Sequence, residues 1–217
     1  MKLVVQLKLQ PSAECASALR ATLRECNAGA DFASRVAFEK KEFSKFGLQK
    51  LVYADLKARG LGAQAAIRTI KKVVDAYATL RANIKAGNLG KPGSKRRDRA
   101  ESKPVEFRAA AAQPYDDRLL SWQMDQQTVS VWTTAGRLKG ISFVGRPEQV
   151  KLLAEFRKGE TDLVERDGGY YLLATCEVPE GPVSSDPVGF LGVDLGIVNV
   201  ATKSDGNPLC GGSGRCR

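Results

Sequence analysis

The stretch "TDLVERDGGYYLLATCEV" (residues 161–178) predicts a β-hairpin. Apolar and polar residues alternate along both of its halves, which is typical of strands with one buried face. Asp167, Gly168 and Gly169 lie between the halves, where a tight turn favours Asp-Gly pairs. An isolated hairpin is only marginally stable, so we expect these strands to pair with others.

The sequence before this hairpin has the same period of two. Apolar and polar residues alternate in four short stretches: "PVEFRA" (104–109), "RLLSWQM" (118–124), "TVSVWTT" (128–134) and "LKGISFVG" (138–145). Turns between the later strands are expected at Asp125-Gln126 and Ala135-Gly136. One helix is expected over about 147–157, because a proline opens it near the first turn.

Residues 105–178 are thus expected to form a compact block rich in strands. Residues 2–10 alternate as well, and this strand is expected to join the block because a lone strand cannot stand by itself. A helical block over 12–86 separates the two. Apolar residues recur there with the helical period in four stretches: about 12–28, 32–46, 48–59 and 63–86. Ser12 is expected to cap the first helix, and Gly29 to end it.

The chain carries a net charge of +10, from 34 lysines and arginines against 24 aspartates and glutamates. A connector rich in Gly, Pro and Ser, residues 87–104, holds a dense basic run. Because lysine and arginine contacts with phosphates release counterions, this charge favours nucleic acid as a partner. A mobile, solvated loop is the simpler interpretation of the same run. The candidate nucleic-acid contacts are Lys91, Lys95, Arg96, Arg97, Arg99 and Lys103.

Several classes of site and location are excluded or disfavoured by composition. Histidine is absent, which excludes Ser-His-Asp and Cys-His catalysis and His-ligated zinc. The five cysteines form no CxxC pair, so no zinc ribbon is encoded. The sequence has no long apolar run and its first residues do not resemble a signal peptide, so we expect a cytoplasmic protein. Catalysis would have to rest on carboxylates, lysine or a metal ion held by oxygen ligands.

One acidic residue stands out near the end of the sequence. After a Pro-, Ser- and Gly-rich linker (179–187), "VGFLGVDL" (188–195) is a near-continuous apolar run typical of a strand buried on both faces. "VNVATKSDG" (198–206) predicts a second strand that runs back to a turn. This pair of strands would present Asp194.

The stretch "GVDLGIVNVATKSDG" (192–206) resembles the first motif of the RuvC-like nuclease domain in the TnpB (OrfB) family. These are transposon-encoded, RNA-guided DNA endonucleases, often described as transposases. Three other stretches agree with the resemblance. Residues 34–81 resemble the family's helical recognition segment, 104–145 its wedge-type β domain, and "GGYYLLATCEVPE" (168–180) the strand before the linker to RuvC.

The resemblance implies an α+β fold with a β-barrel-like wedge domain and an inserted helical domain. The implied parts are a wedge domain (1–10 plus 105–178), a helical recognition domain (11–90), a basic connector (91–104), a linker (179–187) and an incomplete RNase H-like (RuvC) domain (188–217). In the family, the first parts hold guide RNA and the guide–target duplex, and the RuvC-like part cuts DNA with two magnesium ions.

Asp194 matches the first of the three catalytic, metal-binding carboxylates of that family. A pair of magnesium ions needs several carboxylates, and neither Glu180 nor Asp205 matches the others by motif. We therefore expect the N-terminal portion of such an endonuclease, truncated after the first RuvC-like motif. It would bind guide RNA and target DNA, hold Mg²⁺ poorly and no zinc, and not cleave alone, unless a second chain supplies the remaining carboxylates.

Two alternatives stay open. One is a nuclease-dead family member that acts as an RNA-guided repressor. The other sets the resemblance aside and leaves a basic, β-rich RNA-binding protein in which Asp194 is an ordinary carboxylate at a strand end. Aromatic residues that could stack on bases are interpreted as core residues instead, because they lie in alternating strands: Trp122, Trp132, Tyr170 and Tyr171.

Overall fold

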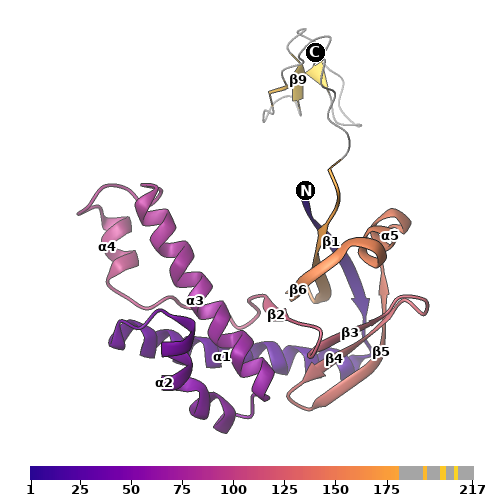
Figure 1. Cartoon of the computed structure of the whole chain (residues 1–217), viewed down its shortest axis with the longest axis horizontal. Coiled ribbons are helices and arrows are strands. Elements are labelled where there is room, and N and C mark those ends of the chain that lie inside the picture. Colours follow the sequence, from indigo (N-terminus) through magenta and orange to yellow (C-terminus); the bar gives the residue numbers. More distant parts are fainter. Residues whose placement is uncertain (181–192, 195–200, 204–207, 210–217) are drawn as a thin grey trace. The chain divides into compact units, whose positions relative to one another are not determined.

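Strand β1 (Lys2–Gln10) lies inside a seven-stranded antiparallel sheet that nearly closes into a barrel (Figure 1). The chain forms two compact units, Met1–Val178 and Pro179–Arg217. The predicted mixture of helices and a barrel-like sheet is confirmed. This computed structural model describes residues 1–180, 193–194, 201–203 and 208–209.

The other strands of the sheet are β2 (Gln113–Tyr115), β3 (Leu120–Gln123), β4 (Thr128–Thr133), β5 (Gly136–Val144), β6 (Arg157–Arg166) and β7 (Gly169–Glu177). Their order across the sheet is β2-β6-β7-β1-β5-β4-β3. β1 pairs with both β7 and β5, so the N-terminal strand joins the later strands as expected. The Tyr115 hydroxyl donates to the carbonyl oxygen of Trp132 at 3.1 Å, which links edge strand β2 to β4.

The hairpin predicted over residues 161–178 is confirmed as β6 and β7. Its turn residues Asp167 and Gly168 have φ angles of 49° and 74°. Positive φ at both positions suits the twist of the flanking strands. Tyr170 is buried in the barrel, as the core interpretation expected, and its hydroxyl donates to the carbonyl oxygen of Ala16 at 2.9 Å.

Three long helices follow β1: α1 (Ala13–Lys40), α2 (Lys45–Ala58) and α3 (Ala63–Lys85). The cap predicted at Ser12 is confirmed, because its hydroxyl accepts from the Cys15 amide at 3.2 Å. A further helix, α5 (Pro147–Phe156), agrees with the helix expected over 147–157. None of the described helices is long and apolar enough to cross a membrane.

The prediction that Gly29 ends the first helix was wrong. The helix expected over 12–28 and most of the one expected over 32–46 form the single helix α1, which ends at Lys40. Gly29 is buried in its middle, and a Cβ atom there would lie 3.0 Å from Leu56 Cδ2 and 3.1 Å from Leu61 Cδ1. The glycine therefore allows close approach of α2 to α1 rather than a turn.

The segment between α3 and β2 also differs from the prediction. The connector expected as a loop over 87–104 contains a short helix, α4 (Lys95–Glu101). The strand expected in "PVEFRA" is absent, because this segment hydrogen-bonds to side chains of α1 and α3 instead of to a strand. The Phe107 amide donates to Asp31 Oδ1 at 2.7 Å, and the Ser34 hydroxyl donates to the carbonyl of Val105 at 2.6 Å.

Buried apolar side chains form two clusters within residues 1–178. One fills the barrel and includes Leu19 and Leu23 of α1, so the helices and the sheet share a core. The other lies among the helices and includes Cys26 and Tyr77. Cys26 is a free thiol whose burial raises its pKa to about 12. Cys15 is a half-buried free thiol.

The second unit contains a three-stranded antiparallel sheet of order β10-β9-β8. Its strands are β8 (Val193–Asp194), β9 (Ala201–Lys203) and β10 (Pro208–Leu209). Asp194 pairs with Thr202 across β8 and β9. The rest of the strand expected over 188–195, and most of the predicted linker, lie outside the described residues.

Candidate nucleic-acid interface

The charge of this protein is divided unevenly along its sequence. Residues 1–108 contain 23 lysines and arginines against 10 acidic residues, a net charge of +13. Residues 109–217 contain 11 against 14, a net charge of −3. The excess positive charge therefore belongs to β1, the helices and the connector, and the later strands contribute none of it.

The candidate contacts of the connector lie on and around α4, at the end of the helices far from the barrel (Figure 1). Lys95, Arg96 and Arg99 are on the helix itself, and Lys91 precedes it. All four side chains are exposed, and none has an ion-pair or hydrogen-bond partner among the described residues. These cations are free to meet phosphate groups.

The other two candidates are already engaged. Arg97 Nε lies 3.1 Å from Glu101 Oε1, one turn along α4, and the arginine side chain is only 22% exposed. Lys103 Nζ lies 3.2 Å from Glu106 Oε2. Of the six predicted residues, four are therefore free cations and two are paired. Their spacing in the sequence did not distinguish the two groups.

A second basic group, missed by the sequence analysis, surrounds the turn from α1 to α2. Lys41 Nζ lies 3.9 Å from the ring centroid of Phe38, and the Arg81 guanidinium lies 4.4 Å from the ring centroid of Phe43. Lys45 Nζ lies 5.9 Å from the ring centroid of Phe46, which is itself exposed. Cations over aromatic rings are attracted by the ring electrons. The ring contacts hold these charges at the surface.

The contact between Arg81 and Phe43 joins this group to the end of α3. The connector follows α3 directly, so both basic groups belong to the same end of the helical part (Figure 1). The signal in the sequence is "FEKKEFSKF" (38–46), where phenylalanines interleave with lysines. Such interleaving is typical of surfaces that combine phosphate contacts with base stacking.

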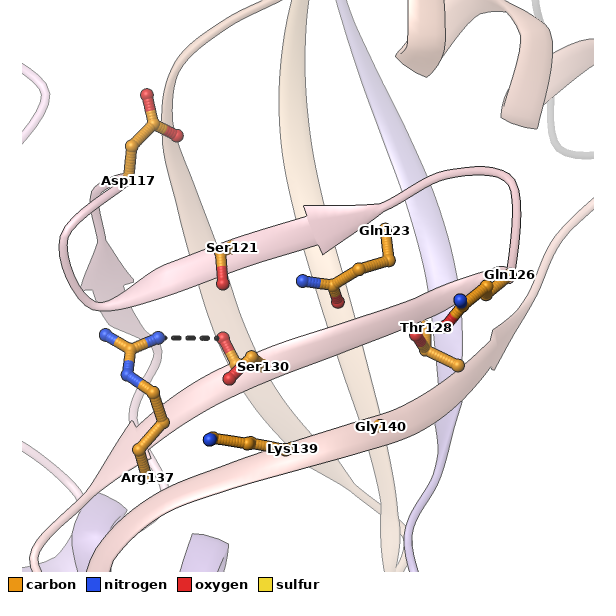
Figure 2. A pocket seen from close by; sticks show the side chains of 9 residues that line it. All are labelled: Asp117, Ser121, Gln123, Gln126, Thr128, Ser130, Arg137, Lys139 and Gly140. Carbon is orange, nitrogen blue, oxygen red and sulfur yellow. Dashed lines mark hydrogen bonds between the residues drawn. The ribbon is translucent and has the colours of Figure 1, made fainter.

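The barrel offers a different surface, a hollow of about 580 Å³ over β3, β4 and β5. Figure 2 shows Ser121, Gln123, Thr128 and Lys139 on one side of these strands. Arg137 Nη1 donates to the Ser130 carbonyl oxygen at 3.4 Å. Strands β3, β4 and β5, which carry this hollow, lie far from α4 (Figure 1), so the two do not form one site.

An ionic cluster fixes the position of α3 against the sheet. Arg68 pairs with Glu160 and, at 2.7 Å, with Asp116 Oδ2. Burial alone would raise the pKa of Asp116, but its hydrogen bonds with Arg68 and the charge of that guanidinium lower it below its usual range. Lys71 extends the cluster, with Nζ 3.6 Å from Glu160 Oε2. These charges are satisfied internally and hold the helical part in place relative to the barrel.

The magnesium site that the resemblance implies is not assembled by the described residues. Asp194 ends strand β8, and its side chain lies outside the described part of the chain. No group of three or more carboxylates or cysteines able to hold a metal ion occurs among the described residues. Asp194 therefore remains a candidate on the strength of its motif, with no observed partner carboxylate.

Comparison with known proteins leaves the family open. No protein-family model and no curated protein matches this sequence.

Proposed function

We propose that this chain is the N-terminal portion of a TnpB-type RNA-guided DNA endonuclease, which binds guide RNA and target DNA but does not cleave alone. The observation that carries the proposal is the set of unpaired cations on and around α4, at the end of a helical part that holds the protein's excess positive charge. Unpaired lysines and arginines can contact phosphates without first breaking an ion pair within the protein.

The order of elements supports the same proposal. The resemblance implies a wedge-type barrel interrupted by a helical recognition domain, and here three helices and α4 stand between β1 and β2 of one sheet. The ionic cluster around Arg68 would keep this helical part at a fixed position beside the barrel. A rigid basic surface suits binding of a long nucleic-acid duplex by its backbone.

Cleavage needs more carboxylates than this chain supplies by motif. Magnesium would bring two cations that stabilise the attacking and leaving oxygens of the phosphate, held by several carboxylates. Asp194 matches one of them, and neither Glu180 nor Asp205 matches the others by motif. Incubated with guide RNA, matched DNA and Mg²⁺, the purified 217-residue chain is expected to leave the DNA intact. Cutting that Asp194→Ala abolishes would contradict this.

The binding proposal is tested by the salt dependence of RNA affinity. The Kd of the chain for a structured RNA is measured between about 50 and 200 mM KCl. Replacing Lys95, Arg96 and Arg99 together by alanine should reduce the slope of log K against log salt by about 2, because about 0.7 counterions are released per phosphate contact with single strands.

The matched control removes the same charge from the barrel. Lys8, Arg146 and Lys151 are exposed there, and their joint replacement by alanine should leave the slope unchanged. If both triple variants reduced the slope equally, the RNA would be attracted by the net charge of the protein alone. A wild-type affinity that does not depend on salt would rule out phosphate contacts.

A further inference from the structure

A hollow of about 560 Å³ lies where the pairing of β2 with β6 stops. The pairing ends at Gln113 opposite Leu163, although β6 continues to Arg166 and stays paired with β7 on its other side. If the register continued, residues 110–112 would face 164–166. No backbone hydrogen bond joins these two stretches in the described part of the chain. The last three residues of β6 therefore have an open edge, and we call this space the edge hollow.

Asn27 of α1 explains why the two stretches separate. Its side chain is 1% exposed, and its Nδ2 donates to the carbonyl oxygens of Ala109 at 3.0 Å and Ala111 at 2.9 Å. The Lys72 ammonium group in turn donates to Asn27 Oδ1. These bonds hold the segment before β2 against α1. The opening is therefore a fixed feature of the fold, since buried hydrogen bonds are costly to break.

The floor of the edge hollow is apolar. Val164 and Leu173 lie on the same face of the β6–β7 ladder, because Val164 faces Tyr171 and side chains two residues apart share a face. The alanines at 110–112 line the opposite wall and leave room beside the strand. The floor can thus take one apolar side chain from a ligand.

The rim of the edge hollow is positively charged. Arg108 and Arg166 are exposed, and neither side chain has an ion-pair or hydrogen-bond partner among the described residues. Of the two carboxylates on the rim, Glu165 is neutralised by Arg20, with 3.0 Å between Oε1 and Nε. Asp167 is the other, in the turn. Two free cations face one free anion, which favours an acidic ligand.

We propose that the edge hollow binds an extended acidic peptide of a partner protein, which adds to β6 as a strand. An open strand edge presents backbone donors and acceptors at the spacing of a second strand, and extended peptides use this mode of recognition. The peptide would place an apolar side chain on Val164 and Leu173, and acidic side chains beside Arg108 and Arg166. Nucleic acid lacks the matching row of amide groups, so the edge favours a peptide.

The probe is the fluorescent peptide ETVTVTE, with KTVTVTK as its charge-reversed partner. Binding to the full chain is measured by fluorescence anisotropy and by amide NMR shifts at 163–167. ETVTVTE should bind, and the double variant Arg108→Glu, Arg166→Glu should weaken it at least about fivefold while strengthening KTVTVTK. The control Arg146→Glu, Lys151→Glu reverses two exposed charges elsewhere and should leave both affinities unchanged. Both double variants alter exposed side chains, and thermal unfolding checks that each is folded.

A second peptide separates strand addition from simple charge attraction. ETVTVTE carrying N-methyl groups on alternate amides keeps its charges but cannot complete the backbone hydrogen bonds. Two such peptides are made, with the methyl groups on the odd or on the even amides. The one whose methyl groups face the edge of β6 should lose about tenfold in affinity. Equal binding of all methylated forms, or no NMR shift at 163–167 with bound peptide, would overturn the proposal. So would an RNA oligonucleotide that shifts those amides and displaces the peptide, because the hollow would then be a nucleic-acid site.

Discussion

The ammonium group of Lys72 lies between α1, α3 and the segment before β2. Its Nζ donates to Asn27 Oδ1 and lies 5.1 Å from the ring centroid of Phe107. Burial lowers the pKa of this lysine from 10.5 to about 8, because the charged form loses its hydration. Near pH 7 the folded protein therefore carries a partly buried charge that costs stability.

This cost predicts an unusual pH dependence. The folded-state pKa lies below that of the unfolded chain, so between about pH 8 and 10.5 the unfolded chain binds more protons at Lys72. Its contribution to the free energy of unfolding should thus rise with pH over that window, by up to about 3 kcal/mol.

Chemical denaturation at several pH values measures this rise by comparing variants with the wild type. Lys72→Met should lack the wild-type increase. The neighbouring Lys71→Met should keep it, because Lys71 is paired with Asp75 at the surface. Identical pH profiles for wild type and Lys72→Met would contradict the lowered pKa.

Gly29 gives a second test at the scale of single residues. Gly29→Val should lower the free energy of unfolding by about 1–3 kcal/mol more than Ala28→Val, because the new side chain would press on Leu56 and Leu61. Ala28 is exposed on the same helix, so its variant measures the intrinsic cost of valine. If the two variants proved equally stable, the close approach of α2 would not depend on this glycine.

The same glycine shows what local pattern could not reveal. Glycine after a helical stretch predicts an end, since it accepts the left-handed backbone of a helix cap. At Gly29 the requirement is instead the absence of a side chain, imposed by a helix more than 25 residues later in the sequence. By contrast, the Ser12 cap depends on its own neighbours alone, and it was predicted correctly.

At the scale of elements, α4 separates two arginines that are adjacent in sequence. Arg96 is free, whereas Arg97 pairs with Glu101 along the helix. Arg96→Ala should reduce the salt slope of RNA binding by about 0.7, and Arg97→Ala should change it little. The measurement is the same titration of RNA affinity against KCl. Equal effects of both variants would show that the pair with Glu101 opens on binding.

Hairpins were predictable because their signals are local. The turn at Asp167-Gly168 and the alternation around it lie within one short stretch, and the structure contains that hairpin. "PVEFRA" alternates equally well but is no strand, since its backbone hydrogen-bonds to Asp31 and Ser34 of α1 and to Tyr77 of α3. Alternation predicts a buried face and leaves the hydrogen-bond partner undetermined.

The candidate site was predictable only in part for a similar reason. The basic run was visible in the sequence, but the pairing of Arg97 depends on the helical spacing of α4. The contact of Arg81 with Phe43 joins residues 38 positions apart, so no local signal predicted it. The edge hollow arises from the place where two strands part, which only their register reveals.

At the scale of the whole molecule, contacts of α1 and α3 hold the helical part against the barrel. Arg68 bridges Asp116 and Glu160 between α3 and the strands, and side chains from α1 enter the core of the barrel. Helices α1 and α3 therefore keep a defined position relative to the sheet. We propose nucleic-acid binding at the helical end and not at the polar hollow of the barrel, because the helical part holds the excess positive charge.

Hydrogen–deuterium exchange of the chain with and without saturating structured RNA tests this assignment most directly. Bound RNA should slow amide exchange in residues 38–46 and 91–103, where the free cations gather, and leave β3–β5 unchanged. Slowed exchange confined to β3–β5, or no change anywhere at saturation, would contradict it.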